Sequence, residues 1–204
     1  MSALTAAEAS LVYLSAVLAT RDEALLEAAL GRALSEADAV AVEEVLLQSY
    51  LFLGYPAALN AFARWRVLSG RRATVNVEPS ESWAERGETV CRAVYGGQYD
   101  GLRANIGALH PDMDRWMVVE GYGKVLGRPG LPLVTRELCI GALLAVQDVP
   151  RQLYSHLRGS LNVGASAAQV AETLAEALPL CSAEARARAE ETWAAVQDRP
   201  KGMS

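Results

Sequence analysis

The chain has 204 residues, 51% of them hydrophobic, and a formal net charge of −5. This is enough apolar material for one domain or two small ones, and the absence of a basic block excludes an extended nucleic-acid surface. No apolar run reaches the roughly 20 residues that span a bilayer, and the N-terminus has no signal-peptide pattern. We therefore expect a cytoplasmic protein that binds neither nucleic acid nor membrane.

The first third of the chain has the pattern of alanine-rich helices. Thr5 and Glu8 form a capping box, in which each side chain bonds the other residue's backbone, at the start of a first helix. Ser35 is expected to cap a third helix, and Gly54-Tyr55-Pro56 is expected to break it. The first helix is expected to follow the capping box and to carry Leu11, Leu14, Val17 and Leu18 at helical spacing, and the next helices are expected to cover residues 22–34, 35–53 and 57–68.

The polar stretch at 69–80 is predicted to be a surface linker, since it is too short to form a sheet of its own. Beyond it the pattern is again helical, with turns at Gly96-Gly97 and His110-Pro111. The expected helices cover residues 82–95, 101–109, 112–126, 133–147, 150–163, 167–178 and 182–196. Because no convincing strand alternation appears, the predicted fold class is all-α.

The helix at 133–147 is apolar on nearly every side, so we expect it to be central and buried. Asp148 and Pro150 break the pattern, and proline is well placed at the first turn of the following helix. In that helix His156 borders the apolar face, because it lies three residues after Leu153 and four before Ser160. Gly164 fits a left-handed helix stop.

Glu137 and His156 are the carboxylate and imidazole that this helix pair would bring together. A short connection makes the two helices antiparallel neighbours. Glu137 precedes the break by about three turns and His156 follows it by about two, so they come within about one turn of the same height at roughly 1.5 Å of rise per residue. Each is costly near an apolar face without a partner.

The cysteines do not suggest a metal or redox centre. Cys91, Cys139 and Cys181 are far apart in the sequence, and no two form a C-x-x-C pair. The odd count and wide spacing favour reduced, buried thiols over disulfides. With only two histidines and no cysteine pair, a zinc site is not expected, and nothing in the sequence requires a metal or organic cofactor.

One stretch combines several motifs at consistent separations: Tyr122-Gly123, Arg128-Pro129-Gly130-Leu131, Thr135-Arg136-Glu137-Leu138, Leu153, His156, Gly164 and the Ser166 cap. This combination resembles the carboxymuconolactone decarboxylase family over roughly residues 87–178. Residues 42–48 and 54–62 are similar to that family's C-terminal helix pair, but here they precede the core. The order is that of a permuted or partly duplicated fold, and the sequence leaves the choice open.

The resemblance implies a domain division and an assembly. Residues 1–69 would be the N-terminal helices that resemble the family's last helix pair, 70–80 a linker, 81–196 the core helices and 197–204 a flexible tail. The helical bundle would be of the carboxymuconolactone decarboxylase or alkylhydroperoxidase D-like type. We expect a homo-oligomer, either a trimer or a dimer that imitates a hexameric ring, and Trp65 and Trp116 are expected to add apolar surface to it.

The resemblance also implies a site. Glu137 and His156 match the family's glutamate and histidine and would be catalytic. From their residue types and positions, Arg128, Arg136 and Tyr122 are the candidate ligands for a small carboxylated substrate. The alternatives are that Arg128 holds the Pro-Gly turn and that Tyr122 is a core or interface residue. The peroxidase branch uses a C-x-x-C that here reads Val149 to Gln152, so alkylhydroperoxidase activity is not expected. The expected function is a cofactor-free decarboxylation of a carboxylated lactone or related acid, by proton transfer. The alternative is a non-enzymatic oligomeric scaffold or small-ligand binder.

Overall fold

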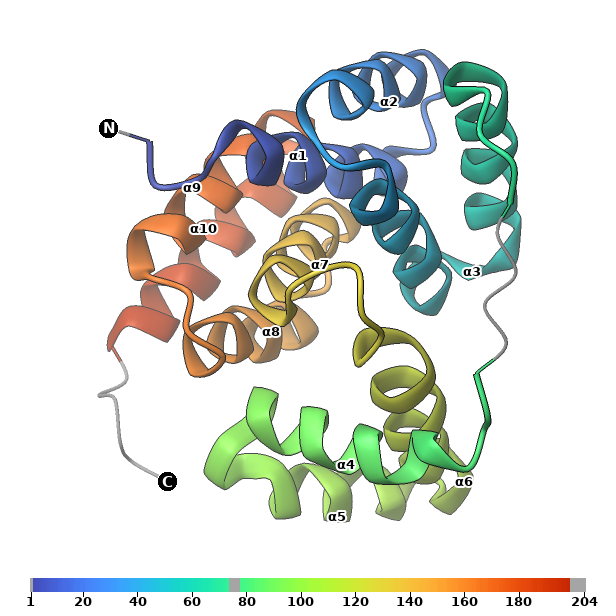
Figure 1. Ribbon diagram of the computed structural model, residues 1–204. Helices are drawn as coiled ribbons and strands as arrows, with labels where there is room; N and C mark the ends of the chain where they lie inside the picture. Colours follow the sequence, from blue (N-terminus) through green and yellow to red (C-terminus); the bar gives the residue numbers. More distant parts are fainter. Residues whose placement is uncertain (1, 74–77, 199–204) are drawn as a thin grey trace.

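A computed structural model describes residues 2–73 and 78–198, and every regular element within them is a helix (Figure 1). The all-α prediction is therefore confirmed. Four residues of the expected linker and the end of the expected tail lie outside the described residues. The elements are α1 (Ala6–Thr20), α2 (Glu23–Glu36), α3 (Ala39–Ser69), α4 (Ser82–Tyr95), η1 (Gly96–Gln98), α5 (Tyr99–Leu109), α6 (Pro111–Trp116), η2 (Met117–Leu126), α7 (Leu133–Gln147), α8 (Pro150–Asn162), α9 (Ala167–Ala177), η3 (Leu178–Leu180) and α10 (Ala183–Asp198).

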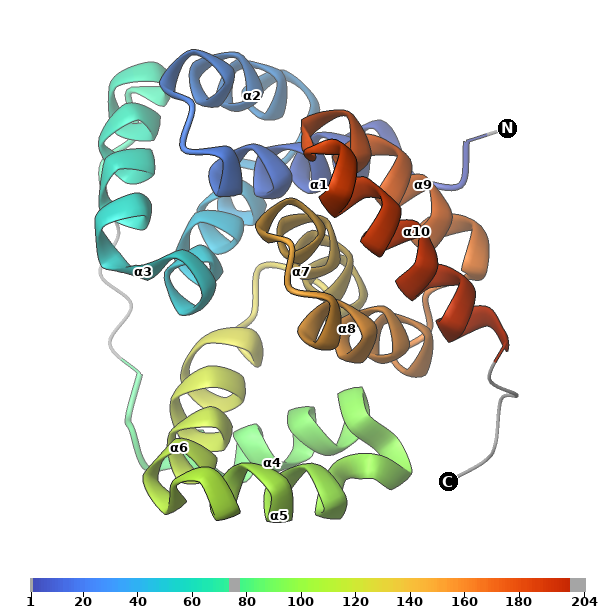
Figure 2. The same cartoon turned by 180° about the vertical axis from the view of Figure 1, so that it is seen from behind.

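Helix α7 is the central element of the fold, as its sequence predicts. Every residue from 135 to 145 is buried. Helices α1, α8, α9 and α10 pack around it, and Figures 1 and 2 show them on different sides of it. The Ser15 hydroxyl on α1 donates a hydrogen bond of 2.7 Å to the carbonyl oxygen of Cys139 on α7. A helix without a polar face can be stable only when neighbours cover it all round.

Helices α4, α5, α6 and η2 form a second layer, at the bottom of Figure 1. Element η2 is a π-helix, where the sequence predicts one regular helix over 112–126. Helix α4 packs against it so closely that a β-carbon on Gly87 or Gly123 would overlap a backbone carbonyl of the facing helix. The side-chain periodicity of an α-helix does not reveal such local widening.

Helix α3 extends from residue 39 to residue 69, but Gly54 divides it. The φ and ψ angles of Gly54 are 80° and 166°, outside the helical region, so the predicted break is confirmed as a kink. By length and mean hydropathy alone α3 could cross a membrane, although the sequence showed no such run. The kink separates it into two shorter segments, and the first contributes Val42, Val45 and Leu46 to the core.

Two local predictions are wrong. Ser35 does not cap α3: it lies inside α2, where its hydroxyl donates to the carbonyl oxygen of Arg32, and Asp38 is the cap instead. The α2 helix simply continues two residues further than expected, to Glu36. Trp65 adds no apolar surface, because it is fully buried and its indole N–H donates to Glu43 at 3.1 Å. Trp116, in contrast, is half-exposed.

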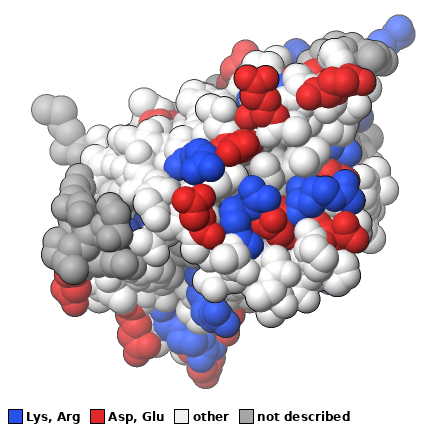
Figure 3. All heavy atoms as spheres, turned by 90° about the horizontal axis from the view of Figure 1, so that it is seen from below, with Lys and Arg blue, Asp and Glu red and all other residues white. Residues whose placement is uncertain are grey.

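The charges on the face seen in Figure 3 are mixed in sign. Lys and Arg side chains lie next to Asp and Glu side chains across the visible surface. Ion pairs of the second layer, such as Arg92 with Glu88 and Arg103 with Asp114, have the same character. Neighbouring charges of opposite sign cancel one another's field over a Debye length, so this face offers no extended surface of one sign.

Candidate functional site

The Glu137 and His156 side chains meet in the interior, between α7 and α8. Nδ1 of His156 lies 2.8 Å from Oε2 of Glu137. The glutamate side chain is fully enclosed, whereas the histidine side chain keeps 9% of its surface accessible. The expectation that the two face each other across the hairpin is confirmed.

The connection between the two helices explains this contact. Asp148 ends α7 in the left-handed conformation, with φ 59°, and Pro150 occupies the first turn of α8. The Asp148 carboxylate is held by Arg188 of α10, with Nε 2.6 Å from Oδ1. A reversal of two residues makes the helices antiparallel, so residues at similar distances from the turn lie opposite each other.

The contact determines which histidine nitrogen is available for chemistry. An ionised carboxylate can only accept a hydrogen bond, so Nδ1 carries the proton that is donated to Glu137. Nε2 has no hydrogen-bond partner among residues 2–73 and 78–198. The Phe52 ring of α3 packs edge-on against the imidazole, with 5.8 Å between centroids. The ring is thereby fixed on one side, and Nε2 remains the nitrogen that can exchange a proton.

The Glu137 carboxylate is only half satisfied. Oε1 is buried and has no hydrogen-bond partner in the described part of the chain. Gly159 of α8 provides the space for the other oxygen, since a β-carbon there would lie 2.8 Å from Oε2 and 2.6 Å from Cγ1 of Val94. Oε1 is therefore the carboxylate oxygen that is open to a water molecule or a ligand group.

Two tyrosines enclose the same interior from the second layer. The Tyr122 hydroxyl donates to the Tyr95 hydroxyl at 3.1 Å, and the rings meet edge-to-face. Burial, followed by the effect of Tyr95 and then of Glu137, raises the pKa of Tyr122 well above its usual value. Burial also raises the pKa of the Cys91 thiol to about 12. These groups stay neutral near Glu137. Tyr122, expected to bind substrate, is 3% exposed and bonded to Tyr95.

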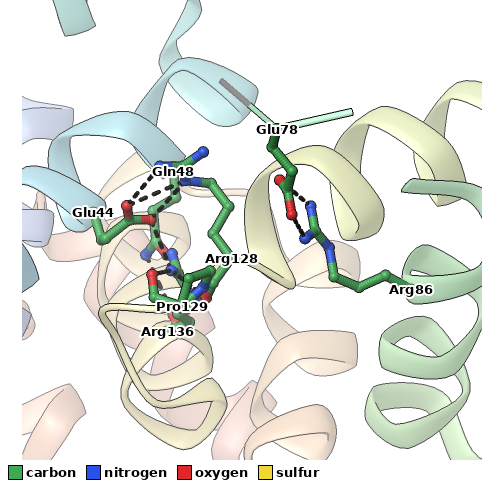
Figure 4. Close-up of polar contacts among 7 residues, drawn as sticks. All are labelled: Glu44, Gln48, Glu78, Arg86, Arg128, Pro129 and Arg136. Carbon is green, nitrogen blue, oxygen red and sulfur yellow. Dashed lines mark hydrogen bonds and ion pairs between the residues drawn. The ribbon is translucent and has the colours of Figure 1, made fainter. Parts of the chain in front are cut away.

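Arg128 and Arg136, the other expected substrate ligands, converge on Glu44 of α3 (Figure 4). Arg128 Nε lies 3.1 Å from both Glu44 oxygens, and Arg136 Nη2 lies 2.8 Å from Oε2. Arg136 also donates to the carbonyl of Arg128 at 3.0 Å and to Gln48 at 3.3 Å. Its side chain is fully enclosed, whereas Arg128 keeps 21% of its side chain accessible. Neither arginine hydrogen-bonds to Glu137 or His156.

The same close-up shows a second ion pair beside this network. Arg86 of α4 binds Glu78 at the end of the linker, with Nη2 2.8 Å from Oε2 (Figure 4). Arg86 also donates from Nε to the carbonyl oxygen of Gly123 at 2.6 Å. Hydrogen bonds from Arg86 lower the pKa of the Glu78 carboxyl. The pair therefore holds the described end of the linker against the second layer.

Sequence reasoning missed the residues that complete the site from other helices. Phe52 and Glu44 come from α3, far from the central hairpin in the chain, and no local pattern connects them to it. Gly159 did carry a signal, because a glycine in a helix interior usually has a packing reason. Within residues 2–73 and 78–198 there is no cluster of three or more His, Cys, Asp or Glu side chains arranged to hold a metal ion.

No curated protein matches the chain. Residues 111–195 match the model of the carboxymuconolactone decarboxylase family, a segment that begins with α6 and ends within α10. It contains Glu137, His156 and Gly159, whereas Glu44 and Phe52 lie outside it. Over residues 111–195, which are less than half of the chain, this protein is therefore similar to the carboxymuconolactone decarboxylase family.

Proposed function

We propose that the protein is a cofactor-free carboxy-lyase that acts on a small carboxylated lactone or a related acid. The observation that carries the proposal is the buried contact of 2.8 Å between His156 Nδ1 and Glu137 Oε2. It leaves Nε2 without a partner among the described residues, on a side chain that is still partly accessible. A histidine oriented by a carboxylate through one nitrogen is a general acid or base through the other.

The chemistry needs one proton transfer. The bond between the substrate carbon and its carboxylate breaks, carbon dioxide leaves, and the electron pair moves into the adjacent carbonyl system. Protonated Nε2 of His156 then delivers its proton to the carbon, and the neutral imidazole regains a proton from water. The Glu137 carboxylate stabilises the protonated ring through Nδ1 and fixes its orientation.

Arg128 is the proposed ligand for the substrate carboxylate. Of the two arginines on Glu44, it alone keeps accessible side-chain surface, at 21%. An arginine that already holds one carboxylate has further N–H donors, and its planar group suits a second carboxylate. Arg136, which is fully enclosed, is proposed only to position Glu44 and the turn at Arg128 and Pro129.

The test is carbon dioxide release from a panel of carboxylated lactones, including carboxymuconolactone, with the purified chain. Turnover should be seen in the parent and lost in His156→Asn, in which the amide keeps a donor for Glu137 but no group replaces Nε2. The matched control is Gln152→Asn on the exposed face of α8, which should keep turnover. Absence of turnover in the parent over the whole panel would contradict the proposal and favour a ligand-binding member of the family.

We also propose that the chain forms a homo-oligomer, a trimer or a dimer that imitates a ring. Support comes from large apolar side chains that remain exposed on the second half of α3 and on α5 and α6: Tyr55, Leu59, Val67, Leu109, Met113 and Trp116. Exposed apolar patches of this kind commonly mark association surfaces. Light scattering that gives a monomer mass at micromolar concentration would contradict it.

A further inference from the structure

A groove of about 440 Å³ lies on the N-terminal part of the molecule. It is formed where α1 ends, α2 begins and the second segment of α3 passes both. Its lining includes neither Glu137 nor His156. A volume of this size is in the range of small-ligand sites.

The floor and the rim of the groove differ in polarity. Val17, Leu18 and Leu53 line it as buried side chains. The charged lining residues are exposed and come from the α1–α2 corner and from α3: Arg21, Asp22, Glu23 and Arg64. An apolar floor with charges at one edge suits a ligand that has a hydrocarbon body and a charged head.

Three of the four charges at the rim are already engaged. Asp22 caps α2, with its carboxylate accepting from the backbone N–H groups of Ala24 and Leu25 at 2.9 and 3.0 Å. Glu23 pairs with Arg64 across the groove at 3.1 Å. Arg21 has no hydrogen bond, ion pair or ring contact with any residue in the described ranges. The rim therefore carries two cations and two anions, and Arg21 is the one of the four whose side chain has no partner in the described ranges.

The backbone at Arg21 ends helix α1 and determines where the Arg21 side chain lies. Two non-glycine residues have a positive φ angle within the described chain, Arg21 and Asp148, both at 59°. This conformation is unfavourable for side chains with a β-carbon. Both residues are the left-handed C-caps of their helices, α1 and α7, and helices commonly end in this way. The cap places the Arg21 side chain at the rim of the groove.

We propose that this groove binds a small carboxylic acid with an aliphatic body, separately from the proposed catalytic site. The hydrocarbon lies on Val17, Leu18 and Leu53, and the carboxylate accepts hydrogen bonds from the Arg21 guanidinium. A planar guanidinium binds a carboxylate through two parallel hydrogen bonds, which makes it selective over a neutral head group. A cation is also favourable at this position, because α1 ends at Arg21.

The groove also adjoins the catalytic side of α3. Leu53 lines the groove, and its neighbour Phe52 packs against the imidazole of His156. The Phe52 carbonyl accepts a hydrogen bond of 3.0 Å from Gln147, next to the turn between α7 and α8. Because the lining residues of the groove do not include Glu137 or His156, binding in the groove can be measured independently of turnover.

The experiment is calorimetric titration of the full chain with decanoate, and with decanol as the neutral probe. The parent should bind decanoate saturably at one site and decanol much more weakly. Arg21→Gln should weaken decanoate binding about tenfold or more, which corresponds to losing one charged hydrogen-bonded contact. Arg151→Gln, which removes an exposed arginine of α8 outside the groove, should leave binding unchanged.

A filling variant makes the location testable. Ala63 is an exposed lining residue, so Ala63→Trp should close the groove and abolish binding, while Ala175→Trp on exposed α9 surface should not. Arg21→Gly removes the side chain and relieves the backbone strain, so it should lose binding without a lower melting temperature. The proposal is overturned if the parent does not bind, if decanol binds as tightly as decanoate, or if Arg21→Gln and Ala63→Trp bind like the parent.

Discussion

Gly159 lies directly against the Glu137 carboxylate, at the point where a β-carbon would stand 2.8 Å from Oε2. Gly159→Ala should therefore push the carboxylate away from His156 and lower turnover strongly, at a destabilisation of about 1–3 kcal/mol from overpacking against Val94. Turnover and urea denaturation measure the two effects. Gly31→Ala is the matched control, since a β-carbon at Gly31 meets nothing within 4 Å and should be neutral or stabilising. Unchanged turnover in Gly159→Ala would show that catalysis does not depend on the position of the Glu137 carboxylate.

His156→Ala and His156→Asn should differ in stability but not in turnover. Alanine leaves the enclosed Glu137 carboxylate without a partner, which costs on the order of 3 kcal/mol or more. Asparagine can still donate to Oε2, so its free energy of unfolding should stay closer to the parent. Urea denaturation of both variants, together with carbon dioxide release, is the measurement. If the His156→Asn variant retained turnover, Nε2 of His156 would have no part in the mechanism.

Glu44 should be the most sensitive residue of the network in Figure 4. Glu44→Ala leaves the fully enclosed Arg136 and the partly enclosed Arg128 without their carboxylate, so we expect a loss of about 3–5 kcal/mol. In the background of Arg136→Met, the same change should cost clearly less. A double-mutant cycle by urea denaturation tests this, and additive losses would show that the pair is not coupled.

The thiols should be unreactive in the folded protein. Burial raises the pKa of Cys91 and of Cys139 to about 12, so neither forms appreciable thiolate near neutral pH. A thiol reagent at pH 8 should label Cys91 and Cys139 only after the protein unfolds. The part-buried Cys181 should be labelled before them. Peroxide turnover with a dithiol donor should be at background. Rapid native labelling of Cys91 or Cys139 would contradict this.

Glu43 should make stability depend on pH. Burial opposes its ionisation, but hydrogen bonds from Arg66 and Trp65 outweigh that effect and lower its pKa below 4.5. Because the folded pKa is depressed, the stabilisation is fully present above 4.5 and is lost as the pH falls through the folded pKa. Glu43→Gln should destabilise by about 1–2 kcal/mol at neutral pH and by much less in acid. Chemical denaturation across this range measures the difference, and a pH-independent difference would contradict the linkage.

Helical periodicity in the sequence predicts much of the fold. The sequence also places several helix ends, because the residues that cap or break a helix act locally: Gly54, Pro150 and Gly164 are examples. The φ angle of Gly164 is 110°, in the left-handed region. Ser35 was misplaced because a serine that can cap a helix can equally bond a carbonyl inside one. The domain division and the choice between permutation and duplication stay predictions.

The sequence by itself determined the all-α class, the buried α7 helix and the meeting of Glu137 with His156. These follow from side-chain periodicity and from a two-residue reversal, which act over a few turns of chain. Only the tertiary structure decided that Arg128 and Arg136 bind Glu44 and that Phe52 packs on His156. It also decided that Arg21 stands unpaired over a groove. The partners in the two ion pairs and in the ring contact lie 84 or more positions apart along the chain, and no local pattern encodes which distant side chain will neutralise or cover another.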